Sequence, residues 1–207
     1  MSITSETKLD KSGAVDFPVL DVIRKRWSPR AFDSRPVEQE KLLTVLEAAR
    51  WAASSMNTQP WRFIIATRDN EAEFEKLLSV INEGNQAWAK DAPVLLLAVA
   101  KKHHDAGWDN RHAQHDVGQA LAYLTLQATE LDLRVRMMGG FDAEKAQAVY
   151  EIPDDFIPMT TLALGYQGTL EQLSEKLQER ELKERTRKPL TELVFGDTWG
   201  SVSSLVK

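Results

Sequence analysis

The sequence predicts one α+β domain in which a sheet of about four strands lies between helices. Two observations predict it. Four short apolar segments are separated by longer segments in which apolar residues recur at helical spacing. One of the short segments, 93–100, is apolar at every position, which is typical of a strand that is covered on both faces. A chain of 207 residues is long enough to bury one sizeable core.

Composition narrows the class of protein. Hydrophobic residues make up 43% of the chain and charged residues 28%, as in an ordinary soluble protein, and the net charge of −5 argues against a nucleic-acid partner. No cysteine is present, which excludes disulfides and thiolate chemistry. Residues 1–16 lack the apolar core of a signal peptide, and the longest apolar run, 92–100, is too short to span a membrane. We therefore expect a cytoplasmic protein without a membrane partner.

The first part of the chain is expected to be a flexible tail over residues 1–15, followed by a single domain over 16–207 that includes a C-terminal extension. Asp16 can cap a first helix that begins near Pro18, since proline is favoured in the first turn. That helix is expected to end near Ser28-Pro29 because proline cannot continue it.

The middle of the chain alternates helices and strands. Its clearest helix is 37–53, in which Leu42, Leu46, Ala49 and Ala53 recur on one face. The other elements expected here are a strand over 61–67, a helix from a cap at Asp69 or Asn70 through Val80, a short helix within 82–91 and a strand over 93–100.

The last part begins with a polar, histidine-rich loop over 101–114 and a helix over 116–131. This helix is apolar nearly all round and must be buried nearly all round, which a chain of this size achieves most easily by dimerising. Further elements follow: a strand over 133–138, a helix capped by Asp142 through Tyr150, a strand over 158–166, a charged helix over 170–184 and a tail that contains Phe195 and Trp199.

Two polar segments carry candidate binding residues. Arg26, Ser28 and Arg30 follow the first helix and suit a phosphate, because guanidinium groups bind its oxygens bidentately. The alternative is a set of solvated charges that offset the helix dipole. The polar run 54–59 suits the edge of a flat heterocycle, although it can equally satisfy its own turns. Together the two segments suggest a phosphorylated aromatic cofactor.

Three later features have both a structural and a functional interpretation. Gly139-Gly140 follows a strand and opens a helix, so it is either a tight turn or a backbone that lies against a planar ring. Arg185 and Arg187, with Lys188 beside them, form either a solvated face or further phosphate ligands. The four histidines, His103, His104, His112 and His115, match no metal-binding spacing, and we expect no metal.

Three motifs in this order, RKRWSPRAF, AARWAASSMNTQPWRF and MMGGFD, resemble those of the FMN-dependent nitroreductase family, in particular its short, homodimeric members. The resemblance extends from Val19 to Leu193. It implies a nitroreductase-like three-layer sandwich with a mostly antiparallel sheet of four to five strands flanked by helices. It also implies an intertwined homodimer with FMN at the subunit interface.

The resemblance assigns roles to particular residues. Arg26 and Ser28 would hold the FMN phosphate together with the late arginines, and Arg30 would lie near the N1/O2 edge of the flavin. Ser54, Asn57 and Gln59 would face the flavin, commonly from the partner subunit, although Ala53 stands where many members have proline. The implied cofactor-binding set is Arg26, Trp27, Ser28, Arg30, Ser54, Ser55, Met56, Asn57, Gln59, Asn85, Met137, Met138, Gly139, Gly140, Arg185 and Arg187.

The resemblance further implies hydride transfer from NADH or NADPH to flavin N5, then reduction of a nitroaromatic, quinone or flavin in the same cleft. The cofactor carries this chemistry, so no catalytic acid, base or nucleophile is expected from the chain. Two alternatives stay open: a flavin reductase that supplies a monooxygenase, and a flavin-binding dimer without turnover.

Overall fold

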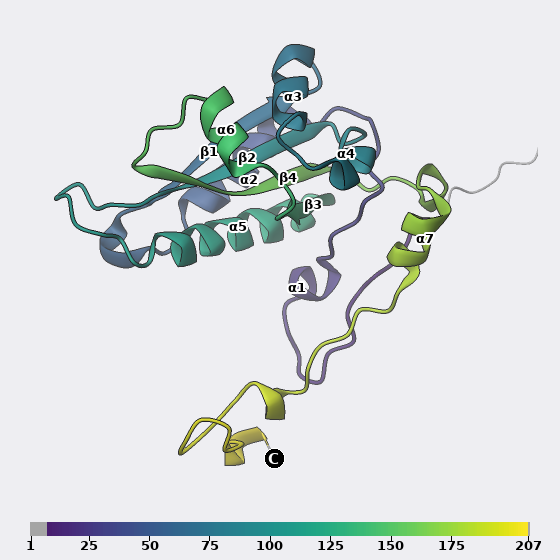
Figure 1. Ribbon diagram of the computed structural model, residues 1–207. Coiled ribbons are helices and arrows are strands. Elements are labelled where there is room, and N and C mark those ends of the chain that lie inside the picture. Colours follow the sequence, from purple (N-terminus) through teal and green to yellow (C-terminus); the bar gives the residue numbers. More distant parts are fainter. Residues whose placement is uncertain (1–7, 207) are drawn as a thin grey trace, which may run out of the picture.

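The fold is a four-stranded antiparallel sheet between two layers of helices (Figure 1). The computed structural model describes residues 8–206. The strands are β1 (Trp61–Thr67), β2 (Val94–Lys101), β3 (Leu133–Met138) and β4 (Phe156–Tyr166), in the order β1-β2-β4-β3. The predicted α+β sandwich is therefore confirmed, with four strands.

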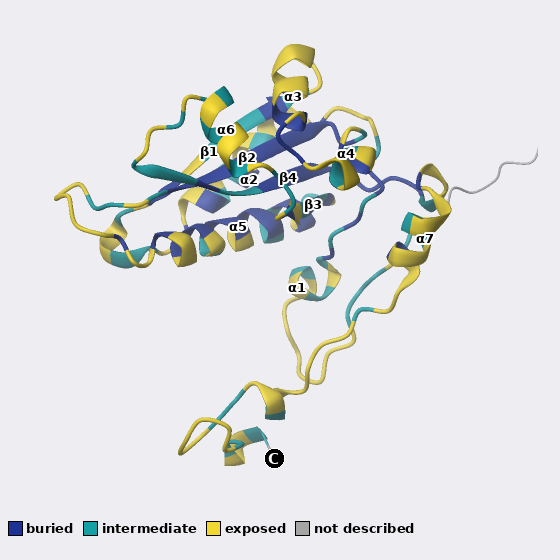
Figure 2. Ribbon diagram, in the orientation of Figure 1, coloured by how far each residue is buried: buried dark blue, intermediate teal, exposed yellow. Residues whose placement is uncertain are grey.

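The central strand β2 shows why the sheet needs helices on both sides. Its side chains alternate between two separate cores: Val94 and Leu96 pack into one, and Leu95 and Leu97 into the other. All residues of β2 before Lys101 are buried (Figure 2). The prediction from the unbroken apolar run is confirmed.

Helices α2 (Gln39–Arg50) and α5 (Ala113–Glu130) cover one face of the sheet, and α3 (Glu71–Leu78), α4 (Glu83–Ala89) and α6 (Ala143–Val149) cover the other (Figure 1). Two expected caps are present. Asn70 accepts the backbone N–H of Glu73 at the start of α3, and Asp142 accepts that of Lys145 at the start of α6.

Several helix boundaries differ from those expected, and those of α1 and α2 are among them. Helix α1 spans only Asp21–Lys25 and begins after Leu20, so the predicted cap at Asp16 is wrong. Helix α2 ends at Arg50 rather than at Ala53, because the N–H of Trp51 closes the last turn and the chain then enters the polar loop.

The expected helix over 170–184 forms as two pieces. A 3₁₀ turn, Leu170–Gln172, is closed by a capping box between Thr169 and Gln172, and α7 (Glu175–Leu182) follows. Each piece has its own local hydrogen bonds, so the prediction of one continuous helix over this range is wrong.

The two ends of the described chain run side by side away from the sheet (Figure 1). Lys11 Nζ donates to the carbonyl of Lys183 (2.6 Å), and Arg185 donates to the carbonyls of Lys11 and Arg24. Part of the tail expected over 1–15, namely 1–7, lies outside the described residues. Of the helices between residues 8 and 206, none has the length and hydropathy needed to cross a membrane.

Candidate functional site

A strongly cationic cavity of about 250 Å³ lies where the two ends of the chain meet the sheet. Arg26 reaches it from the end of α1, Arg136 from β3, and Arg185 from the segment after α7. The full lining is Lys11, Arg26, Trp27, Ser28, Arg30, Arg136, Arg180, Glu181, Lys183, Arg185 and Arg187. Residues far apart in the sequence therefore share one pocket.

Three of the arginines, Arg26, Arg185 and Arg187, form a group that we call the arginine triad. Burial and the nearby charges of Arg185 and Arg187 lower the pKa of Arg26, and burial and Arg187 lower the pKa of Arg185. Within residues 8–206, none of the three pairs with a carboxylate. Arg26 instead donates to Ser28 Oγ at 3.1 Å. The triad consists of mutually repelling cations, and an anion bound between them would relieve that repulsion.

A second group of charged residues in the cavity lining is arranged differently. Arg30 forms an ion pair with the buried Glu181 carboxylate, with 2.7 Å between Nη1 and Oε1. Arg136 donates to the Ser28 carbonyl, and its guanidinium lies 5.4 Å from the centre of the Trp88 ring. Burial, then the charge of Arg30, lowers the pKa of Arg136 to about 10. The role of Arg136 was not anticipated, although an arginine inside a strand just before a glycine pair is a signal that could have been followed.

The contact between Arg136 and Trp88 connects the cavity to α4 and the glycine pair. Asn85 Nδ2 donates to the carbonyl of Gly140 at 3.3 Å. A Cβ at Gly140 would lie 2.8 Å from Asn85 Nδ2, so a larger residue there would displace the amide, whereas Gly139 has open space around it. Two expected site elements are thus brought together beside the cavity.

The two methionines before the glycine pair point in different directions, as neighbouring residues of a strand do. Met137 is 42% exposed, whereas Met138 is buried in the core under α3, α4 and α6. Trp27 is also buried and is one of the residues that line the cavity. A contact of Met138 or Trp27 with a ligand stays a prediction.

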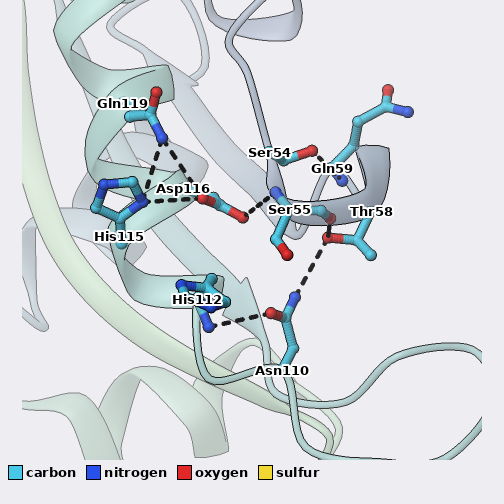
Figure 3. A network of polar contacts seen from close by, with 9 residues as sticks. All are labelled: Ser54, Ser55, Thr58, Gln59, Asn110, His112, His115, Asp116 and Gln119. Carbon is cyan, nitrogen blue, oxygen red and sulfur yellow. Dashed lines mark hydrogen bonds and ion pairs between the residues drawn. The ribbon is translucent and has the colours of Figure 1, made fainter.

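The polar loop 54–59 has a tightly defined conformation (Figure 3). Met56, Asn57 and Gln59 have positive φ angles of 52°, 55° and 45°, which non-glycine residues rarely adopt. Ser54 Oγ accepts the backbone N–H of Gln59 at 3.0 Å and closes the loop. The conformation leaves the side chain of Met56 74% exposed.

Buried groups outside the loop hold it in place (Figure 3). Asp116, whose side chain is 2% exposed, accepts the backbone N–H of Ser55 at 2.9 Å, and it also contacts His115 Nδ1 at 3.0 Å. The buried Asn110 lies 3.3 Å from Thr58 Oγ1. From the sequence, Asp116 was predicted only to begin a helix. Its position on an otherwise apolar face was the signal that it is buried.

The loop and the cationic cavity lie at opposite ends of α5. Ser55 bonds to Asp116 in the first turn of α5, whereas the cavity is beside β3, which follows the last turn. The 18 residues of α5 extend over roughly 27 Å. One chain therefore brings together the arginines, Asn85 and the glycine pair, but it does not bring residues 54–59 to them.

The histidine-rich segment forms a separate surface. His103 bonds to Asp155 and lies 3.3 Å from Asp109, and the rings of His104 and Trp108 stack at 3.6 Å. His115 belongs to the network around Asp116. These contacts tie the 101–114 segment to the chain before β4.

Comparisons with known proteins show what the chain as a whole is similar to. A profile of the nitroreductase family matches residues 23–87 and 72–166. A solved structure described as an oxidoreductase containing FMN is 35% identical, with a TM-score of 0.87 over 94% of this chain and 99% of that one.

Two curated relatives show similarity over most of the chain. An uncharacterized 15.4 kDa protein of Mycolicibacterium smegmatis is 32% identical over 150 residues, which are 68% of this chain and 98% of that protein. A protein of Methanothermobacter thermautotrophicus, provisionally named an NADH dehydrogenase/NAD(P)H nitroreductase, is 28% identical over 155 residues, or 72% of this chain and 76% of that protein.

Proposed function

The chain belongs to the nitroreductase family, and from this premise we propose that it is an FMN-dependent oxidoreductase that takes electrons from NADH or NADPH. Its acceptor would be a small molecule such as a nitroaromatic, a quinone or a free flavin. The similar solved structure that contains FMN and the name of the archaeal relative support the cofactor and the electron donor.

The arginine triad is the observation that carries this proposal. A phosphomonoester has close to two negative charges at neutral pH and three acceptor oxygens. Within residues 8–206, Arg26, Arg185 and Arg187 are cations in one cavity that pair with no carboxylate, and the Ser28 hydroxyl lies beside Arg26. This donor set fits the phosphate of FMN.

The residues beyond the triad fit the rest of the cofactor. Arg30 and Arg136 line the same cavity. Arg136 contacts Trp88 of α4, and the same helix carries Asn85, which donates to the carbonyl of Gly140. The Asn85 amide and the open backbone at Gly139 offer hydrogen bonds to the edge of a ring. When bound, FMN would supply two-electron chemistry at its N5 atom, while the chain binds and orients it and excludes water.

A second copy of the chain would complete the site with its loop 54–59. The distance between the loop and the cavity in one chain supports this arrangement. So does an apolar cavity of about 330 Å³, formed on the α2–α5 layer by Val22, Ala48, Tyr123, Leu126, Gln127 and Glu130. The C-terminal segment also leaves the body with exposed side chains, among them Trp199 at 92% and Leu205 at 86%. Burial of such surfaces favours association.

Reconstitution with FMN followed by anaerobic reduction tests the function. We expect the purified chain to bind one FMN per subunit, to elute as a dimer and to lose its yellow colour when NADH or NADPH is added. Adding a nitroaromatic or a quinone should restore the colour. Bound FMN that neither nucleotide bleaches would indicate a binding protein without turnover, and absence of FMN binding would refute the proposal.

If the reduced protein transfers electrons fastest to free FMN or FAD, it is a flavin reductase. Parallel stopped-flow measurements with a nitroaromatic, a quinone and free FMN make that comparison directly.

A further inference from the structure

A buried carboxylate stands out in the cationic cavity. Among the residues described, Glu181 is the one acidic side chain that lines it, and the side chain is only 3% exposed. Burying a charged carboxylate is costly unless it is paired and hydrogen-bonded. Its neighbour on α7, Glu179, is exposed to solvent, so burial is specific to this position.

Both carboxylate oxygens of Glu181 accept hydrogen bonds from Arg30. Oε1 lies 2.7 Å from Arg30 Nη1, and Oε2 accepts the backbone N–H of Arg30 at 3.2 Å. The carboxylate therefore holds the main chain and the guanidinium of Arg30 at the same time. Arg30 and Glu181 are separated by 151 residues, so this contact also anchors α7 against the segment after α1.

Arg136 makes this group a charge cluster rather than an isolated pair. All three residues line the cavity. Burial lowers the pKa of Arg136, the charge of Arg30 lowers it further, and the charge of Glu181 opposes the shift, so both charges act on Arg136. Two cations and one carboxylate give this group a net charge of about +1. Within residues 8–206, no carboxylate pairs with the arginine triad.

We propose that Glu181 is a positioning residue that fixes Arg30 beside the flavin and offsets its charge, and that it thereby sets the reduction potential of the bound cofactor. This inference rests on the proposed function. Two-electron reduction leaves negative charge at the N1/O2 edge of the ring. A cation there favours the reduced flavin, and a carboxylate behind that cation opposes it.

The substitution Glu181→Gln tests the inference because glutamine keeps an acceptor for Arg30 while removing the negative charge. We expect the midpoint potential of the FMN-loaded protein, measured by spectroelectrochemistry, to rise. A tenfold gain in affinity for reduced over oxidised FMN corresponds to ~30 mV for a two-electron couple, and we expect at least that. Glu179→Gln removes the same charge from the exposed face of α7 and should leave the potential unchanged.

A potential that stays the same or falls in Glu181→Gln, with FMN still bound, would overturn the inference. A double substitution covers the case in which the single variant does not fold, because replacing both members of a buried pair is tolerated better than removing one. The double variant removes one charge of each sign, so its potential should stay close to that of the wild type. A fall of ~30 mV or more would show that Glu181 does not offset the charge of Arg30 and would also overturn the inference.

The oxidised wild-type protein separates this inference from the proposed function. If it binds no FMN, both fail. If it binds FMN and is bleached by NAD(P)H but Glu181→Gln does not change the potential, only the role of Glu181 is wrong.

Discussion

Removing one cation from the arginine triad should weaken FMN binding without destabilising the chain. The perturbation is Arg26→Gln. In the apo-protein, Arg26 is half-buried, and its burial together with repulsion by Arg185 and Arg187 lowers its pKa. Its side chain donates a hydrogen bond to Ser28 Oγ, and a glutamine amide can still donate there. We therefore expect the free energy of unfolding of the apo-protein to stay the same or to rise.

The FMN-bound protein, in contrast, should lose binding free energy when Arg26 is replaced. A hydrogen bond to a charged group contributes roughly 1.5–3 kcal/mol, which corresponds to a factor of about 10 to 150 in Kd. No carboxylate within residues 8–206 pairs with the triad, so the phosphate has no protein anion to displace. The full free energy of the hydrogen bond therefore contributes to the affinity for FMN. The loss should be smaller at high salt, because exposed parts of the cavity are screened.

Titration of the apo-protein with FMN and with riboflavin separates the phosphate from the ring. The Kd for FMN should rise about 10- to 150-fold in Arg26→Gln, whereas the Kd for riboflavin should not change. Arg24→Gln is the matched control, since Arg24 pairs with Asp21 and does not line the cavity. An equal loss for FMN and riboflavin, or a marked fall in the unfolding free energy, would refute the reasoning.

Two further predictions concern stability. Asp116→Ala should lower the free energy of unfolding in urea by roughly 1.5–3 kcal/mol, because it leaves the N–H of Ser55 without its acceptor. Asp116→Asn keeps an acceptor and should lower the free energy of unfolding by less. Equal decreases in the two variants would contradict this role of Asp116. Hydrogen bonds from Arg50 and Trp51 lower the pKa of Glu47 to about 2, below its unfolded value of 4.5. Glu47 therefore stabilises the fold above about pH 4.5, and this contribution is lost as the pH falls towards 2. In urea titrations over that range, the stability difference between the wild type and Glu47→Gln should disappear; a difference independent of pH would show that the charge is not responsible.

The sequence by itself determined the elements of the sheet and most of its helices. Strands β1 and β3 lie where they were expected, and Asn70 and Asp142 cap α3 and α6. These features are local: periodicity of 2 or 3.6 residues and a cap within one turn are set by neighbouring residues. The three motifs were also sufficient to identify the family, which the comparisons confirm.

The tertiary structure alone decided which charged groups face one another. Arg30 meets Glu181 across 151 residues, and Ser55 meets Asp116 across 61. The sequence indicates the partner in neither contact. The apolar face of α5 indicates that Asp116 is buried but not what it binds, and on a helix such as α7 a buried carboxylate and an exposed one look alike. The same holds for Arg136, whose position in the cavity depends on the path of β3. Local preferences specify elements, but the cost of burying a charge is settled only by the groups that the fold brings to it.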